Sequence, residues 1–154
     1  MSNPITEKKY TFVDDFSLKM EQIGHPRIYG QILGWLLICD PPEQSFSDLM
    51  NNLNISKASV SNTTRMLLEA GFIKKVRLTG ERQVYFRMQK GALIGFMERQ
   101  LGIIHQLKEI SEEGLSIIQD ENADSSRLNE MNTFYTFLDS EIPTLIEKYK
   151  KDNS

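Results

Sequence analysis

The 154-residue sequence lacks the features that would place it in a membrane or an oxidising compartment. Its single cysteine, Cys39, has no second thiol in the chain with which to form a disulfide. The longest apolar run, residues 32–39, is much shorter than the ~20 residues that cross a bilayer. The first ten residues have no apolar core of the kind found in signal peptides. These absences predict a cytoplasmic protein that does not contact a membrane.

Patterns typical of enzymes and metal sites are also absent. The only histidines, His25 and His105, are far apart and have no cysteine or acidic companion at ligand spacing. No glycine-rich phosphate loop and no nucleophile motif occurs. We therefore predict no enzymatic activity, no cofactor and no metal. Cys39 follows an apolar helix without a basic neighbour, which favours a buried, inert thiol over the alternative of a redox sensor.

Charge is strongly segregated along the chain. The whole chain has a net charge of −3, but residues 54–90 hold eight basic and two acidic side chains, a net of +6, so the remainder carries −9. A basic block in an acidic protein is typical of a localised surface for a polyanion. The alternative is a solvated hairpin whose charges have no ligand.

Apolar spacing predicts mostly helices. Residues 6–23 place Phe12, Phe16, Met20 and Ile23 on one stripe, and Gly24 follows as a helix-ending residue. Residues 25–42 form an apolar helix bounded by prolines, in which Gly30 and Gly34 allow another helix to approach closely. Next, Ser45 and Asp48 have capping-box spacing at the start of a short helix that turns at Asn54.

A second short helix and a hairpin follow. Ser56 is a good N-cap and Gly71 a good C′ residue, and the buried side between them consists of Val60, Thr64, Leu67 and Leu68. Two helices joined by a tight turn form a helix-turn-helix. After Gly71 the apolar residues alternate in "FIKKVRL" and "RQVYFRM", which predicts a β-hairpin that turns at "TGE".

The side of residues 57–69 that points away from Val60 is small and polar. At about 100° per residue, Ala58, Asn62, Arg65 and Glu69 lie opposite Val60, flanked by Ser59, Ser61 and Met66. Small residues permit close approach to DNA, whereas Asn and Arg can bond bases or phosphates. The same residues also occur on ordinary solvated helix faces.

Apolar residues continue through two long C-terminal helices. Residues 90–118 are apolar on more than one side, with Phe96 and Ile103 among them. In the last helix apolar residues repeat at intervals of three and four, the pattern of a helix lying along another helix. A subunit interface and an intramolecular helical hairpin are both consistent with this pattern. We expect Ser140 to cap a new turn and Pro143 to kink this helix. The predicted dimer-interface residues are Leu128, Met131, Tyr135, Leu138, Ile142 and Leu145.

A helix-turn-helix followed by a basic hairpin is the winged helix-turn-helix arrangement. The segments "GHPRIYGQILGWLLI", "SFSDLMNNLNISKASVSNTTRMLLEAGFI" and "GERQVYFRM" resemble the MarR family of bacterial regulators, in particular the branch similar to the regulator of glycine betaine synthesis. The resemblance covers residues 24–88 well. It implies a mainly helical fold with a small β-hairpin wing, in which N- and C-terminal helices dimerise.

The resemblance also implies a function. Such regulators bind double-stranded DNA as homodimers at inverted repeats, and a repressor is the role we expect here. The implied organisation is an N-terminal helix over residues 1–23 that joins the dimerisation region, a DNA-binding domain over 24–90 and a dimerisation region over 91–154. Together with the basic block, it predicts the DNA-binding residues Lys57, Ala58, Ser59, Ser61, Asn62, Arg65, Lys75, Arg77 and Arg82.

The effector is the least constrained prediction. Aromatic side chains suit a small-molecule ligand such as a choline-like cation, although aromatics at helical spacing are more often core residues. A winged helix that contacts an acidic protein partner instead of specific DNA is the alternative function. The predicted ligand pocket consists of Tyr29, Trp35, Phe96, Phe134 and Tyr135.

Overall fold

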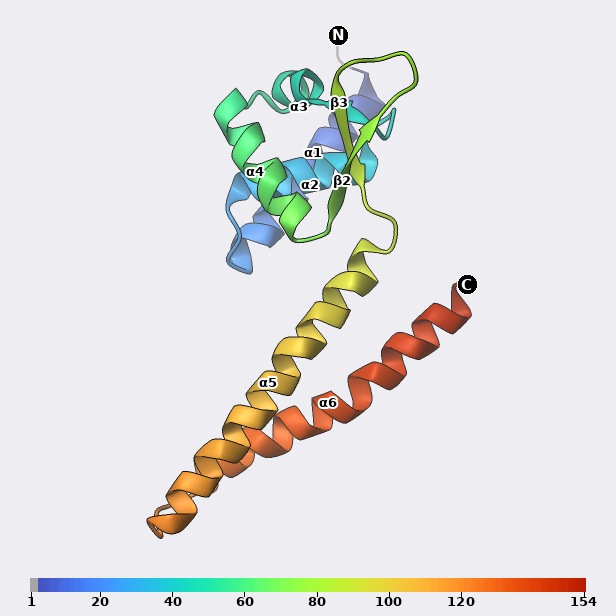
Figure 1. The fold of residues 1–154 in the computed structure, drawn as a ribbon. Helices are drawn as coiled ribbons and strands as arrows, with labels where there is room; N and C mark the ends of the chain where they lie inside the picture. The colour runs from blue at the N-terminus through green and yellow to red at the C-terminus, as the bar shows by residue number, and fades with distance from the viewer. Residues whose placement is uncertain (1–2) are drawn as a thin grey trace. The chain divides into compact units, whose positions relative to one another are not determined.

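A computed structural model describes residues 3–154 and divides the chain into two compact units (Figure 1). The N-terminal unit ends at Ala92, and the C-terminal unit comprises residues 93–154. The predicted fold class, mainly helical with a small β-hairpin wing, is confirmed. The N-terminal unit contains α1 (Pro4–Gln22), α2 (Arg27–Ile38), β1 (Gln44–Ser45), α3 (Phe46–Leu53), α4 (Lys57–Glu69), β2 (Ile73–Arg77) and β3 (Val84–Met88).

The sheet has one strand more than the sequence predicted. β2 and β3 form the expected antiparallel hairpin, in which Ile73 is opposite Met88 and Arg77 is opposite Val84. The two-residue strand β1 pairs antiparallel with the other edge of β3, which gives the order β1-β3-β2. Two residues are too few for an alternating pattern, so β1 could not be read from periodicity.

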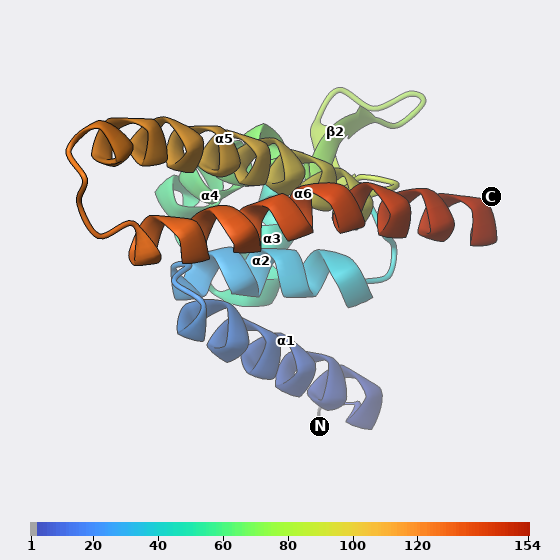
Figure 2. The ribbon, with the colours of Figure 1, turned by 90° about the horizontal axis from the view of Figure 1, so that it is seen from below.

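α1 and α2 pack side by side at an unusually close contact (Figure 2). A Cβ atom added at Gly30 would lie 2.6 Å from the Cα of Ser17. The predicted role of Gly30 in close helix approach is thereby confirmed, with α1 as the partner. The prediction for α1 itself was partly wrong: Phe12 and Ile23 are exposed, whereas Val13 and Ser17 are buried. At the closest contact between the two helices the buried residue is Ser17, because only a small side chain fits there. Hydropathy alone does not predict that a serine is buried.

The core of the N-terminal unit lies between the helices and the sheet. Ile32 of α2, Leu49 of α3 and Phe86 of β3 are almost completely buried, and Val60 and Leu67 bring the inner side of α4 into the same cluster. Residues from three other elements therefore hold α4 on the unit, and one side of this helix is left at the surface.

The C-terminal unit consists of two long helices, α5 (Ala92–Asp120) and α6 (Ser126–Asp152), of which α5 begins at the last residue of the N-terminal unit. The predicted cap at Ser140 is wrong: α6 is continuous through Pro143, and the Ser140 hydroxyl donates to the Phe137 carbonyl instead. Among the described residues, no helix combines the length and the apolar character required to cross a membrane.

Candidate nucleic-acid interface

α3 and α4 form the predicted helix-turn-helix. The capping box is present, because the Ser45 hydroxyl accepts from the Asp48 amide and the Asp48 carboxylate accepts from the Ser45 amide. α3 ends at Asn54, which adopts the left-handed conformation with φ 52°. Asn tolerates this conformation better than most residues, so the chain turns within three residues to the cap of α4.

Both ends of α4 are closed by the residues that the sequence predicted. The Ser56 hydroxyl accepts from the Ser59 amide at 3.1 Å, which satisfies one of the free amides of the first turn. At the other end Gly71 has φ 78°, and the Phe72 amide donates to the Leu67 carbonyl. This is the C-terminal geometry that favours glycine. α4 is therefore a 13-residue helix with both ends capped, so which residues face the core and which face solvent is fixed.

One side of α4 is buried and the opposite side is exposed. Val60, Thr64 and Leu67 are buried as predicted; Leu68 is half-buried, and Thr63 is also buried. On the outer side, Lys57, Ala58, Ser61, Asn62 and Arg65 are exposed, and Ser59 is half-exposed. We call these six residues the α4 outer face.

Hydrogen bonds order part of the α4 outer face. Arg65 donates through Nη2 to the Asn62 Oδ1 atom at 3.0 Å, so the two longest polar side chains of the face lie together. Near the first turn the Ser56 hydroxyl donates to the Ser59 hydroxyl at 2.9 Å. The face therefore presents a small, polar beginning and an Asn–Arg pair one turn further along. Both are compatible with base edges and phosphates.

The wing, β2–β3 with its connecting turn, supplies the other cations. Lys75 and Arg77 alternate on β2, Arg82 follows the turn, and all three are exposed. Gly80 in the turn has φ 81°. The turn is held to β3 by the Tyr85 hydroxyl, which donates to the Glu81 carboxylate and accepts from Gln83 Nε2. The bond to Glu81 raises the pKa of Tyr85 above its ordinary value.

Not every cation of the basic block is free for a ligand. Arg87 of β3 lies directly across from Lys74 in the hairpin register and forms an ion pair with Glu43 at 3.7 Å. Glu43 is next to β1, so this pairing depends on the strand that sequence periodicity could not detect. Lys75, Arg77 and Arg82 remain as exposed cations of the wing.

The predicted interface residues of α6 do not all have the same surroundings within one chain. Leu128, Met131, Tyr135 and Leu138 are half-buried, and Ile142 is buried. Leu145 is 63% exposed and borders an apolar cavity of about 320 Å³ in the C-terminal unit, together with Leu93, Met97 and Tyr149. One end of the pair is therefore an open apolar groove.

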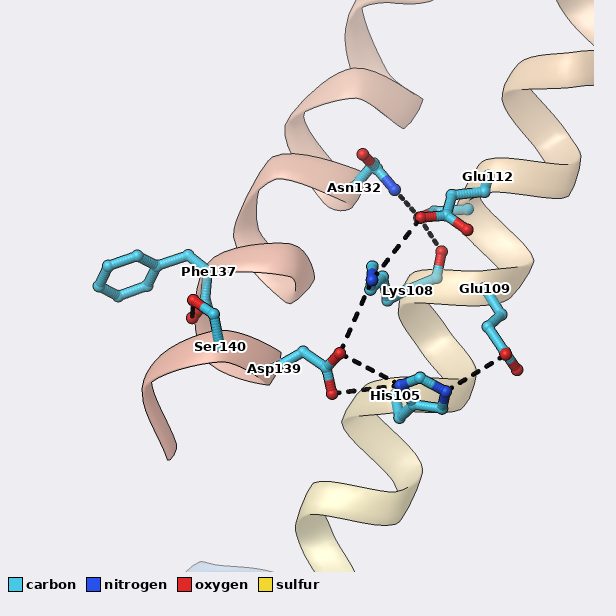
Figure 3. Close-up of polar contacts among 9 residues, drawn as sticks. His105, Lys108, Glu109, Glu112, Asn132, Phe137, Asp139 and Ser140 are labelled. Atoms are coloured by element: carbon cyan, nitrogen blue, oxygen red, sulfur yellow. Dashed lines mark hydrogen bonds and ion pairs between the residues drawn. The ribbon is translucent and has the colours of Figure 1, made fainter. Parts of the chain in front are cut away.

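Polar contacts join α5 to α6 in the middle of the pair (Figure 3). Asn132 Nδ2 donates to the buried Ser111 hydroxyl at 2.9 Å. Asp139 lies 3.1 Å from His105 Nδ1 and 3.7 Å from Lys108 Nζ, and His105 Nε2 lies 3.2 Å from Glu109. The hydrogen bond to Asp139, and then the negative charges of Asp139 and Glu109, raise the pKa of His105. These contacts fix the register of the two helices. They also correct the expectation from the sequence, because His105 does have acidic neighbours, Glu109 one turn along α5 and Asp139 on α6.

The predicted ligand residues are divided between the units. Tyr29 and Trp35 are buried in the N-terminal unit, where Tyr29 stacks on His25 and Trp35 stacks on Tyr10. The other three belong to the C-terminal unit, in which Phe134 is 55% exposed. A pocket shared by all five stays a prediction. The remaining residues of that set are Phe96 and Tyr135.

Cys39 ends α2 and is half-buried. Burial raises the pKa of its thiol to about 11, which keeps the thiol protonated near neutral pH. The prediction of an inert thiol agrees with this pKa.

The chain is similar to known transcriptional regulators. Residues 91–152 match a family model described as an MmpR5-like MarR family transcriptional regulator. The HTH-type transcriptional regulator MmpR5 of Mycobacterium tuberculosis is 29% identical over 141 residues, which cover 91% of this chain and 86% of that protein. The crystal structure of a transcriptional regulator superposes with a TM-score of 0.77 at 28% identity, covering 94% of this chain and 99% of the other.

Proposed function

We propose that the chain is a winged-helix transcriptional regulator of the MarR family and that it represses transcription by binding an inverted-repeat operator as a homodimer; its similarity to MmpR5 and to a solved transcriptional regulator supports this proposal. The observation that carries this proposal is the polar α4 outer face. It lies on a helix with a capped N-terminus, and a cationic wing follows this helix in the chain. A helix of this kind fits the major groove of B-DNA, which is about 12 Å wide.

α4 is the recognition helix in this proposal. Ala58 and Ser61 allow the backbone of the first turns to come close to the DNA, and the amides of that turn face phosphate oxygens. Arg65, already held by Asn62, reads guanine or holds a phosphate, while the Asn62 amide group donates to an acceptor on a base edge. Lys57 and Ser59 contact the backbone at the helix start.

The wing contacts the DNA backbone beside the major groove. Lys75, Arg77 and Arg82 are separate cations on a hairpin whose turn is tied down by Tyr85 and Glu81. We assign Arg82 to the minor groove, because it follows the turn, and Lys75 and Arg77 to phosphates. Contacts of this kind strengthen binding to any sequence and make it depend on salt.

The homodimer is formed by the C-terminal unit. Leu145 and Tyr149 leave an apolar groove beside Leu93 and Met97, which a second copy would cover in an isologous contact. Two recognition helices then face half-sites that are about 34 Å apart, one turn of DNA. A cytoplasmic location, the betaine-regulator branch and a choline-like effector remain predictions from the sequence.

Salt-dependent DNA binding by three variants tests the assignment of α4 and the wing. Arg65→Ala should cost about 1–3 kcal/mol and relax the preference at one operator position, because a base contact is lost. Arg82→Ala should weaken specific and random DNA alike and reduce the salt slope by about one. Lys8→Ala, which removes an exposed cation of α1, is the matched control and should have little effect.

A different pattern would favour a protein-interaction module. In that case wild-type protein and Arg65→Ala would bind operator and random DNA with equal affinity and equal salt slopes. Loss of binding to an acidic protein partner would then be the only consequence of removing the cations.

A further inference from the structure

The N-terminal unit contains a cavity of about 530 Å³ that none of the DNA contacts uses. It is lined by the first turns of α1, by α2, by the connection from α2 to β1 together with β1 itself, by the helix α3 and by the wing. Its size is within the range of small-molecule sites in proteins, about 300–1,000 Å³. All of its lining residues belong to the N-terminal unit, so its shape is defined within a single unit.

Aromatic side chains form one wall of the cavity, and hydrogen bonds hold them in place. Tyr10 stacks on Trp35 with ring centroids 5.4 Å apart and 9° between the planes. Trp35 Nε1 donates to the Gln44 Oε1 atom at 2.9 Å, and Gln44 Nε2 donates to the Pro41 carbonyl at 2.9 Å. Tyr85, from the wing, adds a third ring. This wall is preformed, which lowers the entropic cost of binding a ligand.

The charge in the cavity is negative, although the wing that borders it is basic. Asp40, Glu43, Asp48 and Glu81 line it, and Lys9 is the one cation among the lining residues. Asp48 is bound to the Ser45 amide and Glu81 to the Tyr85 hydroxyl.

The other two carboxylates of the cavity, Asp40 and Glu43, are held less firmly by the rest of the described chain. Glu43 has only the 3.7 Å ion pair with Arg87, which is outside the cavity lining. Asp40 is exposed and forms no ion pair within residues 3–154. Two available carboxylates beside aromatic rings provide the two attractions that a cation with an apolar body requires, an ion pair and a cation–π contact.

We propose that this cavity binds a small organic cation, an amine with an aromatic or apolar body. The ammonium group lies near Asp40 and Glu43, and the body of the ligand lies against Tyr10 and Trp35. A bound amine would connect α1 to the turn end of the wing through Tyr85. The effect of this connection on operator affinity rests on the proposed function, whereas the binding itself does not.

The fluorescence of Trp35 tests the site directly, because it is the only tryptophan in the chain. The full-length protein is titrated with phenethylamine and, separately, with 2-phenylethanol, a neutral molecule of similar shape. We expect a saturable change with the amine and a much weaker response to the alcohol. Equal responses to both molecules, or no saturable response to the amine, would overturn the proposal.

Carboxylate variants locate the binding site. Asp40→Asn and Glu43→Gln should each weaken amine binding about fivefold, the upper value for a half-exposed ion pair, and the double variant should lose more. Asp15→Asn removes an exposed carboxylate of α1 outside the cavity and should bind like the wild type. An unchanged affinity in the double variant would contradict the site.

The fluorescence titration contains no DNA, so its outcome is independent of operator binding. Amine binding in a protein without operator specificity would overturn only the proposed function. Operator specificity without amine binding would overturn only the cavity proposal.

Discussion

The two units of the chain differ in where their apolar side chains lie. The N-terminal unit buries Ile32, Leu49 and Phe86 almost completely and assembles a core from helices and sheet. Among the described residues of the C-terminal unit, only Ile142 and Ile146 are buried apolar side chains, while Leu93 and Ile117 are more than 60% exposed.

This difference indicates which unit needs a partner. Burial of apolar surface is the main stabilising contribution in a small domain, and two helices that expose large apolar side chains over their length obtain little of it alone. The N-terminal unit has its own core and can devote its surface to polar recognition. The C-terminal unit is completed, in our proposal, by a second copy.

Dissociation of the dimer is the largest effect that we expect. In the dimer, Leu145→Glu would bury two unpaired carboxylates at the interface, one from each copy. Each should cost about 1–3 kcal/mol of dimer stability. The dimer dissociation constant, measured by sedimentation equilibrium, should rise about 100-fold or more. Leu37→Glu, at a 46%-exposed apolar position of α2, is the matched control and should stay dimeric. Equal behaviour of the two variants would remove α6 from the interface.

A smaller but local effect is expected where α1 meets α2. Gly30→Ala would bring a Cβ atom within 2.6 Å of the Ser17 Cα, so the helices must separate at a cost of about 1–3 kcal/mol in urea unfolding. Gly102→Ala in α5 meets no atom within 4 Å and should instead stabilise by about 0.5–1 kcal/mol, the ordinary helix preference. Opposite signs are the expected result; equal destabilisation would mean that the tight contact is not specific to α1 and α2.

Loss of the α4 cap should cost about 1 kcal/mol. Ser56→Ala removes the hydroxyl that accepts from the Ser59 amide, and frays the first turn of the helix assigned to DNA. Thermal unfolding and operator affinity should both decrease. Ser47→Ala, at an exposed position in the first turn of α3, should leave both nearly unchanged. If Ser56→Ala changed neither thermal unfolding nor operator affinity, packing alone would hold α4 in place.

The smallest effect concerns pH. Because the pKa of His105 is raised in the folded protein, His105 holds its proton more tightly there than in the unfolded chain, so protonation stabilises the fold. This contribution is complete below the ordinary pKa of about 6.5 and is lost as pH rises through the higher folded value.

Urea unfolding between pH 6 and 8 measures this contribution. His105→Gln should flatten the decline in stability across that interval, and Asp139→Asn should do the same because it removes the main partner. Glu113→Gln changes the charge of α5 outside the cluster and should keep the wild-type slope. An identical slope in wild type and His105→Gln would assign the pH dependence to other groups.

Local signals predicted most of the N-terminal unit. Ser45, Ser56 and Gly71 act through their nearest neighbours in sequence, so their caps were visible before the fold was known. The burial of Ser17 was not, because it depends on Gly30 in another helix. β1 and the Arg87–Glu43 pair depend likewise on contacts between distant segments.

The same distinction holds for the candidate sites. The α4 outer face follows from helical geometry and could be derived residue by residue. The cavity beside the wing unites Tyr10, Asp40 and Tyr85 from three separate segments, and no spacing rule connects them. Ser140 illustrates the reverse case, in which a local signal predicted a helix cap and α6 instead continues through Pro143.

The central claim, that two copies of α4 read an inverted repeat, is tested most directly by footprinting on the DNA upstream of the protein's own gene. We predict two protected half-sites related by a two-fold axis, with centres about one turn or a whole number of turns apart, that remain protected at moderate salt. Protection that spreads without sequence preference and disappears as salt is raised would contradict the account.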